Sequence, residues 1–128
     1  MKVLLDTHTW LWFVLGDSSL SPAARSLIED PANEKIVSPA SYWETAIKIS
    51  IGKYTLPQAY DQFIRHAIAG QGFSVLPILP SHTSALISLP FHHRDPFDRL
   101  LVAQSLAEAI PLISNDTIFD AYLVKRLW

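Results

Sequence analysis

The sequence predicts an α/β domain whose central, mostly parallel sheet has four to five strands. Two observations support this class, and a third predicts a single domain. Short apolar runs alternate along the chain with segments of helical period, which is typical of parallel strands joined by helices. The apolar runs do not alternate with polar residues, as expected for strands buried on both faces. No repeat and no glycine- or serine-rich linker divides the 128 residues, so we expect one domain over residues 1–128.

The first strand is expected at Val3–Leu5, an apolar run that ends at Asp6. A helix over His8–Leu15 follows from apolar residues at helical spacing and from the glycine that comes directly after them. A second helix, Pro22–Glu29, opens with a serine cap and a proline suited to the first helical position.

The second strand is expected at Lys35–Val37 and is followed by the same pair of signals, Ser38 and a proline. They open a helix that ends near Gly52 and carries apolar residues on one side. An amphipathic helix is expected over Pro57–Ala69, because its apolar residues recur at threes and fours.

The third strand is expected at Phe73–Ile78, and a short helix bounded by prolines at Ser81–Ser88. Asp95 and the following proline cap a longer helix over Phe97–Ala109. The remaining expected strands are Leu112–Ile113 and, as a fifth, the tail Tyr122–Trp128.

Composition limits the chemistry. The chain has no cysteine, which excludes disulfides, thiolate zinc sites and a cysteine nucleophile. The apolar run near the start is too short for a signal peptide and no stretch is long enough for a membrane span, so we expect a cytoplasmic protein. Twelve acids against ten bases argue against a nucleic-acid binder driven by overall charge.

Four carboxylates are expected at one edge of the sheet. Asp6 and Asp116 follow the first and fourth strands, and Glu44 and Asp98 lie early in helices that start at the same edge. In open parallel sheets, ligands bind outside the carboxyl ends of the strands. The sequence therefore predicts a ligand site built from these acids.

Each acid also has a structural explanation. Glu44 fits a capping box with Ser41, Asp98 fits a first-turn acid that stabilises its helix, and Asp116 could close a turn. Asp6 has little turn chemistry around it. All four together favour a functional site, because acids gathered at one edge repel one another unless a cation is present.

Oxygen ligands without cysteine suit Mg²⁺ or Mn²⁺. A divalent ion can activate water and neutralise a phosphate, so the predicted chemistry is phosphodiester hydrolysis. Other enzyme and regulatory classes fit less well. A haloacid-dehalogenase-type phosphatase needs an acid where His8 stands, a response-regulator receiver needs an Asp after the third strand, and a nucleotide-binding module needs a glycine-rich loop.

Four runs resemble PIN-domain ribonucleases in order and spacing, and most closely the VapC-like toxins of type II toxin–antitoxin modules. The runs are VLLDTHTWLW, SPASYWETAIKISIGK, HHRDPFDRLLVAQSLAE and PLISNDTIFDAY. The resemblance implies a PIN-like three-layer α/β/α domain with Asp6, Glu44, Asp98 and Asp116 as metal-binding catalytic residues. It also implies a metal-dependent endoribonuclease toxin that forms a homodimer and is neutralised by a small antitoxin. The alternative is an inactive PIN-like interaction module.

Several nearby residues are candidates for supporting the ligands or for contacting RNA. Asp95 is interpreted as a helix cap with a supporting role, and Ser114 belongs to the motif that ends in Asp116; Thr7, Arg99 and Lys48 are further candidates. Setting the four ligands aside leaves eight acids against ten bases, so the acid excess is local to the site. Basic residues in the motif runs could then meet RNA phosphates: Lys48, Lys53, Arg94 and Arg99.

Alternatives remain open for the basic and aromatic residues. Lys48 could equally pair with Glu44 one turn earlier. His92 and His93 are interpreted as surface loop residues, and His8 as either close to the site or part of a helix start. Three tryptophans could stack on bases, although core or dimer contacts are favoured for them: Trp10, Trp12 and Trp43.

Overall fold

The computed structural model describes residues 1–128 and contains one five-stranded sheet in the order β3-β2-β1-β4-β5. All four strand pairings are parallel, which confirms the predicted α/β class. The strands are β1 (Lys2–Leu5), β2 (Glu34–Val37), β3 (Ser74–Val75), β4 (Leu112–Ile113) and β5 (Arg126–Leu127). The central strand β1 is apolar without alternation because Val3, Leu4 and Leu5 are all fully buried.

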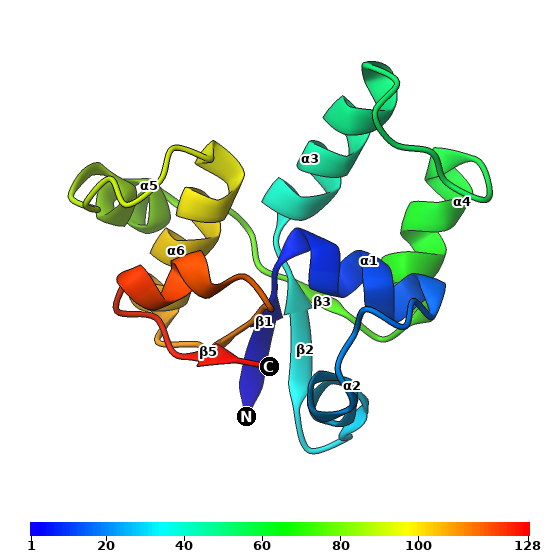
Figure 1. The fold of residues 1–128 in the computed structure, drawn as a ribbon, viewed down its shortest axis with the longest axis horizontal. Helices are drawn as coiled ribbons and strands as arrows, with labels where there is room; N and C mark the ends of the chain where they lie inside the picture. Colours follow the sequence, from blue (N-terminus) through cyan, green and yellow to red (C-terminus); the bar gives the residue numbers. More distant parts are fainter.

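Helices cover both faces of this sheet, as Figure 1 shows. They are α1 (Thr7–Leu15), α2 (Pro22–Glu29), α3 (Pro39–Ser50), α4 (Tyr60–Arg65), α5 (Pro80–Ile87) and α6 (Pro96–Glu108). The predicted caps are confirmed, since the side chains of Ser21, Ser38 and Asp95 accept hydrogen bonds from the first turns of α2, α3 and α6. No helix combines the length and apolarity that crossing a membrane requires.

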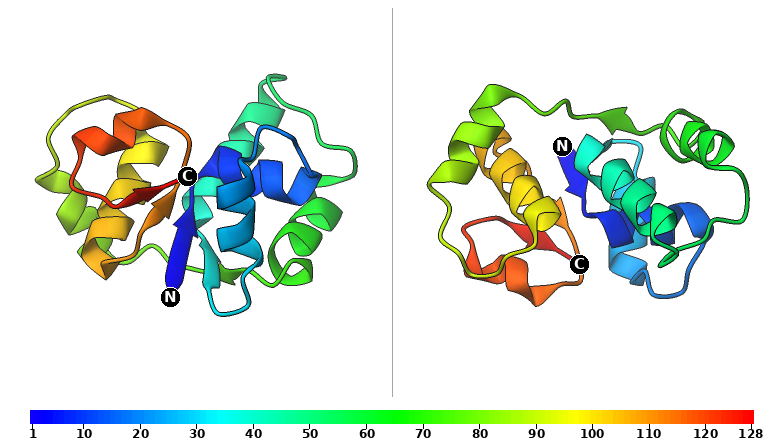
Figure 2. Two further views of the ribbon diagram at one scale, coloured as in Figure 1. Left: turned by 60° about the horizontal axis from the view of Figure 1, so that its bottom comes forward. Right: turned by 90° about the horizontal axis from the view of Figure 1, so that it is seen from above.

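Two hydrophobic clusters, one on each face of the sheet, fill the space between the sheet and the helices. Val3 and Leu5 of β1 face the first cluster, which includes Trp10 of α1 and Ile28 of α2. Leu4 points to the other face, where the second cluster includes residues of α6. Successive side chains of a strand point to opposite faces, so β1 joins both clusters and the domain has three layers, α/β/α (Figure 2).

Three elements differ from the sequence prediction. Only Ser74–Val75 of the expected strand Phe73–Ile78 pairs with β2, and the chain then reaches Pro77, which has no amide hydrogen for a ladder. The helix expected from Pro57 begins at Tyr60 without a side-chain cap and ends in a π-helical turn, His66–Gly70. The tail pairs only at Arg126–Leu127.

Candidate active site

Asp6 stands at the carboxyl end of β1 and caps α1. Its Oδ1 accepts a hydrogen bond from the Thr9 amide at 2.8 Å, and its Oδ2 accepts one from Ser114 Oγ at 2.5 Å. Burial raises the pKa of Asp6, although the hydrogen bonds from Ser114 and Thr9 oppose that shift. Ser114 follows β4, so this contact joins the ends of the two central strands. The sequence indicated little turn chemistry around Asp6, whereas the structure shows that Asp6 caps a helix.

Glu44 lies on α3 and is held at both carboxylate oxygens. Thr7 Oγ1 donates to Glu44 Oε1 at 2.8 Å, and Lys48 Nζ lies 2.9 Å from Glu44 Oε2. The capping-box interpretation is wrong, because Ser38 caps α3 and Glu44 is buried against α1 instead. Of the two alternatives for Lys48, the pairing with Glu44 one turn earlier is confirmed.

Asp98 lies in the first turn of α6, whose cap is Asp95. Asp95 Oδ1 accepts hydrogen bonds from the amides of Phe97 and Asp98, each at 2.9 Å. The interpretation of Asp95 as a helix cap is therefore confirmed. Asp116 is exposed and caps the short 3-10 helix Thr117–Ala121, accepting from the Ile118 amide at 3.0 Å. That short helix was missed in the sequence, although Asp116 is a signal for a helix start.

The four predicted acids act on one another electrostatically. The pKa of Asp98 rises from its ordinary value of 3.8 to about 8, first because of burial and then because of nearby negative charge on four other carboxylates. Those carboxylates belong to Asp95, Asp6, Glu44 and Asp116. Since the part of this shift that comes from charge requires carboxylates near Asp98, the structure places Asp6, Glu44 and Asp116 in its neighbourhood at one edge of the sheet.

This donor set fits a hard divalent cation. The acids supply only oxygen ligands, and their mutual repulsion is the electrostatic condition that a cation relieves. No three His, Asp or Glu side chains already lie close enough together to form a complete metal-binding group. Mg²⁺ takes one or two carboxylates and keeps several waters, so an open arrangement of this kind is compatible with it.

Arg99 does not serve as the expected RNA contact. It is 5% exposed, and its guanidinium donates to the carbonyls of Pro90 and Leu89 and to the Tyr122 hydroxyl. Its Cζ atom lies 3.9 Å from the centre of the Phe91 ring. These contacts join Arg99 to the loop before α6, and its burial keeps the guanidinium away from a phosphate in solution.

His93, interpreted from the sequence as a surface loop residue, is instead a neighbour of Asp98. Its Nε2 lies 3.3 Å from Asp98 Oδ2, and its Nδ1 lies 2.8 Å from the Tyr122 hydroxyl. Arg99 already donates to the Tyr122 oxygen, so the Tyr122 hydrogen can point to Nδ1. His93 then carries its own hydrogen on Nε2, directed at Asp98 Oδ2, and orients that carboxyl group.

The tryptophans divide between the core and the surface. Trp10 is fully buried and donates through Nε1 to the Ala67 carbonyl, so its core role is confirmed. Trp43 is 57% exposed and meets the Phe97 ring edge-on at 5.1 Å between ring centres. Trp12 is half-buried and stacks with His8.

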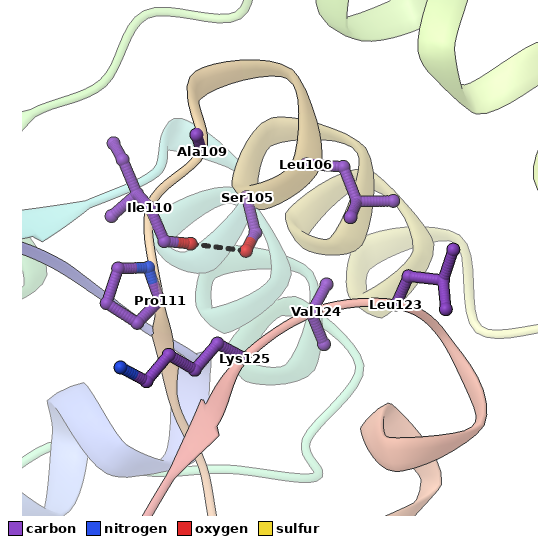
Figure 3. A pocket seen from close by; sticks show the side chains of 8 residues that line it. All are labelled: Ser105, Leu106, Ala109, Ile110, Pro111, Leu123, Val124 and Lys125. Atoms are coloured by element: carbon purple, nitrogen blue, oxygen red, sulfur yellow. Dashed lines mark hydrogen bonds between the residues drawn. The ribbon is translucent and has the colours of Figure 1, made fainter.

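A separate cavity of about 300 Å³ lies between the end of α6 and the segment leading into β5, as Figure 3 shows. Pro111 precedes β4 and Lys125 precedes β5, so this cavity borders the amino-terminal ends of those strands. The carboxylates lie at the opposite ends. Because its lining contains no acid, the cavity is not part of the carboxylate site.

Solved structures share the fold at low sequence identity. VapBC2 from Rickettsia felis, bound to a DNA fragment from their promoter, aligns with a TM-score of 0.72 and 14% identity over 100% of this chain and 99% of that chain. VapBC-1 from nontypeable Haemophilus influenzae aligns with a TM-score of 0.64 and 17% identity over 99% of this chain and 97% of that chain. FitAcB from Neisseria gonorrhoeae aligns with a TM-score of 0.63 and 13% identity over 98% of this chain and 96% of that chain.

The search of curated proteins finds no match. The family model described as "PIN domain" matches residues 3–123, which include all four acids of the site. With nearly its whole length covered by that model, this chain belongs to the PIN domain family.

Proposed function

We propose that this protein is a Mg²⁺- or Mn²⁺-dependent endoribonuclease that acts as the toxin of a toxin–antitoxin pair. The observation that carries the proposal is the gathering of four carboxylates at one sheet edge, where burial and then the negative charge of the neighbouring carboxylates raise the pKa of Asp98 to about 8. Such an arrangement costs free energy unless a cation occupies it. The resemblance to VapC-like toxins supplies RNA as the substrate class.

The residues that would hold the ion are Asp6, Glu44, Asp98 and Asp116. An ion held there supplies positive charge for the phosphate and orients a water for attack. The surrounding side chains hold the ligands in position. Ser114 fixes one oxygen of Asp6, and Thr7 and Lys48 fix the two oxygens of Glu44. These contacts hold the carboxylates in place before a cation binds, so the side chains lose less conformational freedom when it does.

The experiment that tests this function is cleavage of total cellular RNA by the purified protein, followed by sequencing of the new ends. We expect cleavage with Mg²⁺ or Mn²⁺ and none in excess EDTA. The products should carry a 5′-phosphate and a 3′-hydroxyl, because water rather than the 2′-hydroxyl attacks. Cleavage that survives EDTA, or ends with a 2′,3′-cyclic phosphate, would contradict the proposal. A pure protein with no cleavage under any metal would favour the inactive interaction module.

His93 should matter for the same activity without being a ligand. Replacing it with Ala removes the hydrogen bond to Asp98 and is expected to raise the Mg²⁺ concentration for half-maximal cleavage about 10- to 100-fold. His93→Gln keeps a donor and should restore part of the loss. His92→Ala is the matched control, because His92 only packs against the Tyr122 ring. Equal effects at His92 and His93 would show that the loop, not the hydrogen bond, matters.

The negative charge of the four carboxylates also suggests how the protein is inhibited. We propose a homodimer that a small partner protein inhibits, with an Arg or Lys of the partner replacing the cation at the acidic edge. Coexpression with the small reading frame beside the gene should yield a copurifying complex and relieve toxicity. A neighbouring product that neither copurifies nor protects the cells would exclude it as the partner.

A further inference from the structure

A second cavity, of about 310 Å³, lies between α1 and α3 beside the carboxylates. Its lining includes two residues of the first turn of α1, Thr7 and His8, and Trp12 one turn later. Lys48 of α3 and the segment after it, with Lys53 and Tyr54, complete the wall. The volume lies at the lower end of the range for small-ligand sites, which suits one nucleotide.

The lining combines aromatic rings with positive charge. Two lysines and three rings, those of His8, Trp12 and Tyr54, line the cavity, and no acid does. His8 and Trp12 stack with ring centres 5.7 Å apart and an angle of 23° between their planes. In a chain with more acids than bases, an acid-free wall with two lysines is a local exception. Rings and cations together are what single-stranded nucleic acids bind.

The cavity is joined to the carboxylate site through Glu44. Thr7 and Lys48 line the cavity and also contact Glu44, at 2.8 and 2.9 Å. The Lys48 ammonium has three hydrogens, so its contact with Glu44 leaves two for another acceptor. Lys53 takes part in none of the six ion pairs of the structure. Both lysines can therefore bind an anion in the cavity, with Lys48 on the side of Glu44.

We propose that this cavity binds one nucleotide of the RNA strand beside the scissile phosphate. Its base stacks against the rings of Trp12, His8 or Tyr54, and Lys53 and Lys48 bind its phosphate. This inference rests on the proposed function and deepens it by assigning a substrate subsite. The lining favours a nucleotide over a polypeptide segment, because its only aliphatic side chain is the buried Leu11.

The first test is NMR titration of the metal-free protein in EDTA with adenosine 5′-monophosphate and, separately, ribose 5-phosphate. The nucleotide should shift the Trp12 indole N–H and the amides of Lys53 and Tyr54. Ribose 5-phosphate has no base and should bind about tenfold more weakly. No shifts at these residues with nucleotide concentrations of about 10 mM, or equal affinity for the two probes, would overturn the inference.

The second test uses variants in binding and in RNA cleavage. Lys53→Ala should weaken nucleotide binding and raise KM for RNA, each about tenfold, with kcat little changed. Trp12→Leu should reduce the preference for nucleotide over ribose 5-phosphate. Lys2→Ala is the charge-matched control, because Lys2 is exposed at the amino-terminal end of β1 and pairs with Glu34. Equal effects of the two lysine variants would overturn the assignment.

The outcomes separate this inference from the proposed function. Nucleotide binding in the cavity by a protein that never cleaves RNA would support the nucleotide site and refute the nuclease. RNA cleavage with unchanged KM in Lys53→Ala would refute the subsite alone. If a copurifying partner polypeptide shifts the cavity resonances and the nucleotide does not, the cavity is a protein-binding site and the inference is wrong.

Discussion

Asp98→Asn is expected to lower RNA cleavage by about 100- to 1000-fold or more, the scale known for removing one hydrogen-bond donor from a preorganised active site. The substitution keeps the size of the side chain and removes the negative charge that a cation would bind. The fold should remain intact, because the α6 cap is Asp95 and not Asp98. Initial rates on the RNA identified by end sequencing, measured across Mg²⁺ concentrations, test this expectation.

Asp6→Asn should have the same effect on cleavage. Asn caps helices about as well as Asp, so the hydrogen bond from the Thr9 amide can persist in this variant. Loss of activity would then report the lost charge rather than a disrupted α1. Added Mg²⁺ should raise the melting temperature of the unmodified protein more than that of either variant.

Asp61→Asn is the matched control for both substitutions, because Asp61 is an exposed acid in the first turn of α4, away from the sheet edge. It should retain full activity and the full response to Mg²⁺. If Asp6→Asn and Asp98→Asn are less stable than the unmodified protein but equally active, the acids support the fold and the active site lies elsewhere.

The main elements of the fold could be predicted because their signals are local. The central strand is an apolar run with no alternation, and Ser21, Ser38 and Asp95 cap the helices that follow them. The edge strand β3 was predicted too long, since apolar character indicates burial but pairing stops where the chain leaves β2. The short 3-10 helix at Thr117 was missed because five residues give no periodicity.

That the four acids lie near one another could also be predicted, since parallel strands bring their carboxyl ends together. The role of Arg99 could not be predicted from its position next to Asp98 in the sequence. Consecutive residues on a helix point about 100° apart, so Arg99 turns into the loop contacts while Asp98 faces the acids. The direction of His93 depends on an irregular loop, for which sequence spacing gives no rule.

The free energy of unfolding of the metal-free protein should fall as the pH rises from about 5 to 9. The folded protein retains a proton on Asp98 up to a pKa of about 8, whereas the unfolded chain releases it near 3.8. The folded state therefore binds more protons between these values, and the stability present at low pH is lost as pH passes through 8. Burial raises the pKa of Asp6 in the same direction.

One pKa unit corresponds to about 1.4 kcal/mol, and water around a partly exposed side chain reduces the effect, so we expect a loss of about 2–3 kcal/mol. Urea unfolding at several pH values in EDTA measures it. Asp98→Asn should flatten the profile and be the more stable protein at pH 9, while Asp61→Asn should keep the original slope. Excess Mg²⁺ should oppose the decline, because it binds the ionised carboxylates that repel one another without it. An unchanged slope in Asp98→Asn would mean that the strain at this edge is not centred on Asp98.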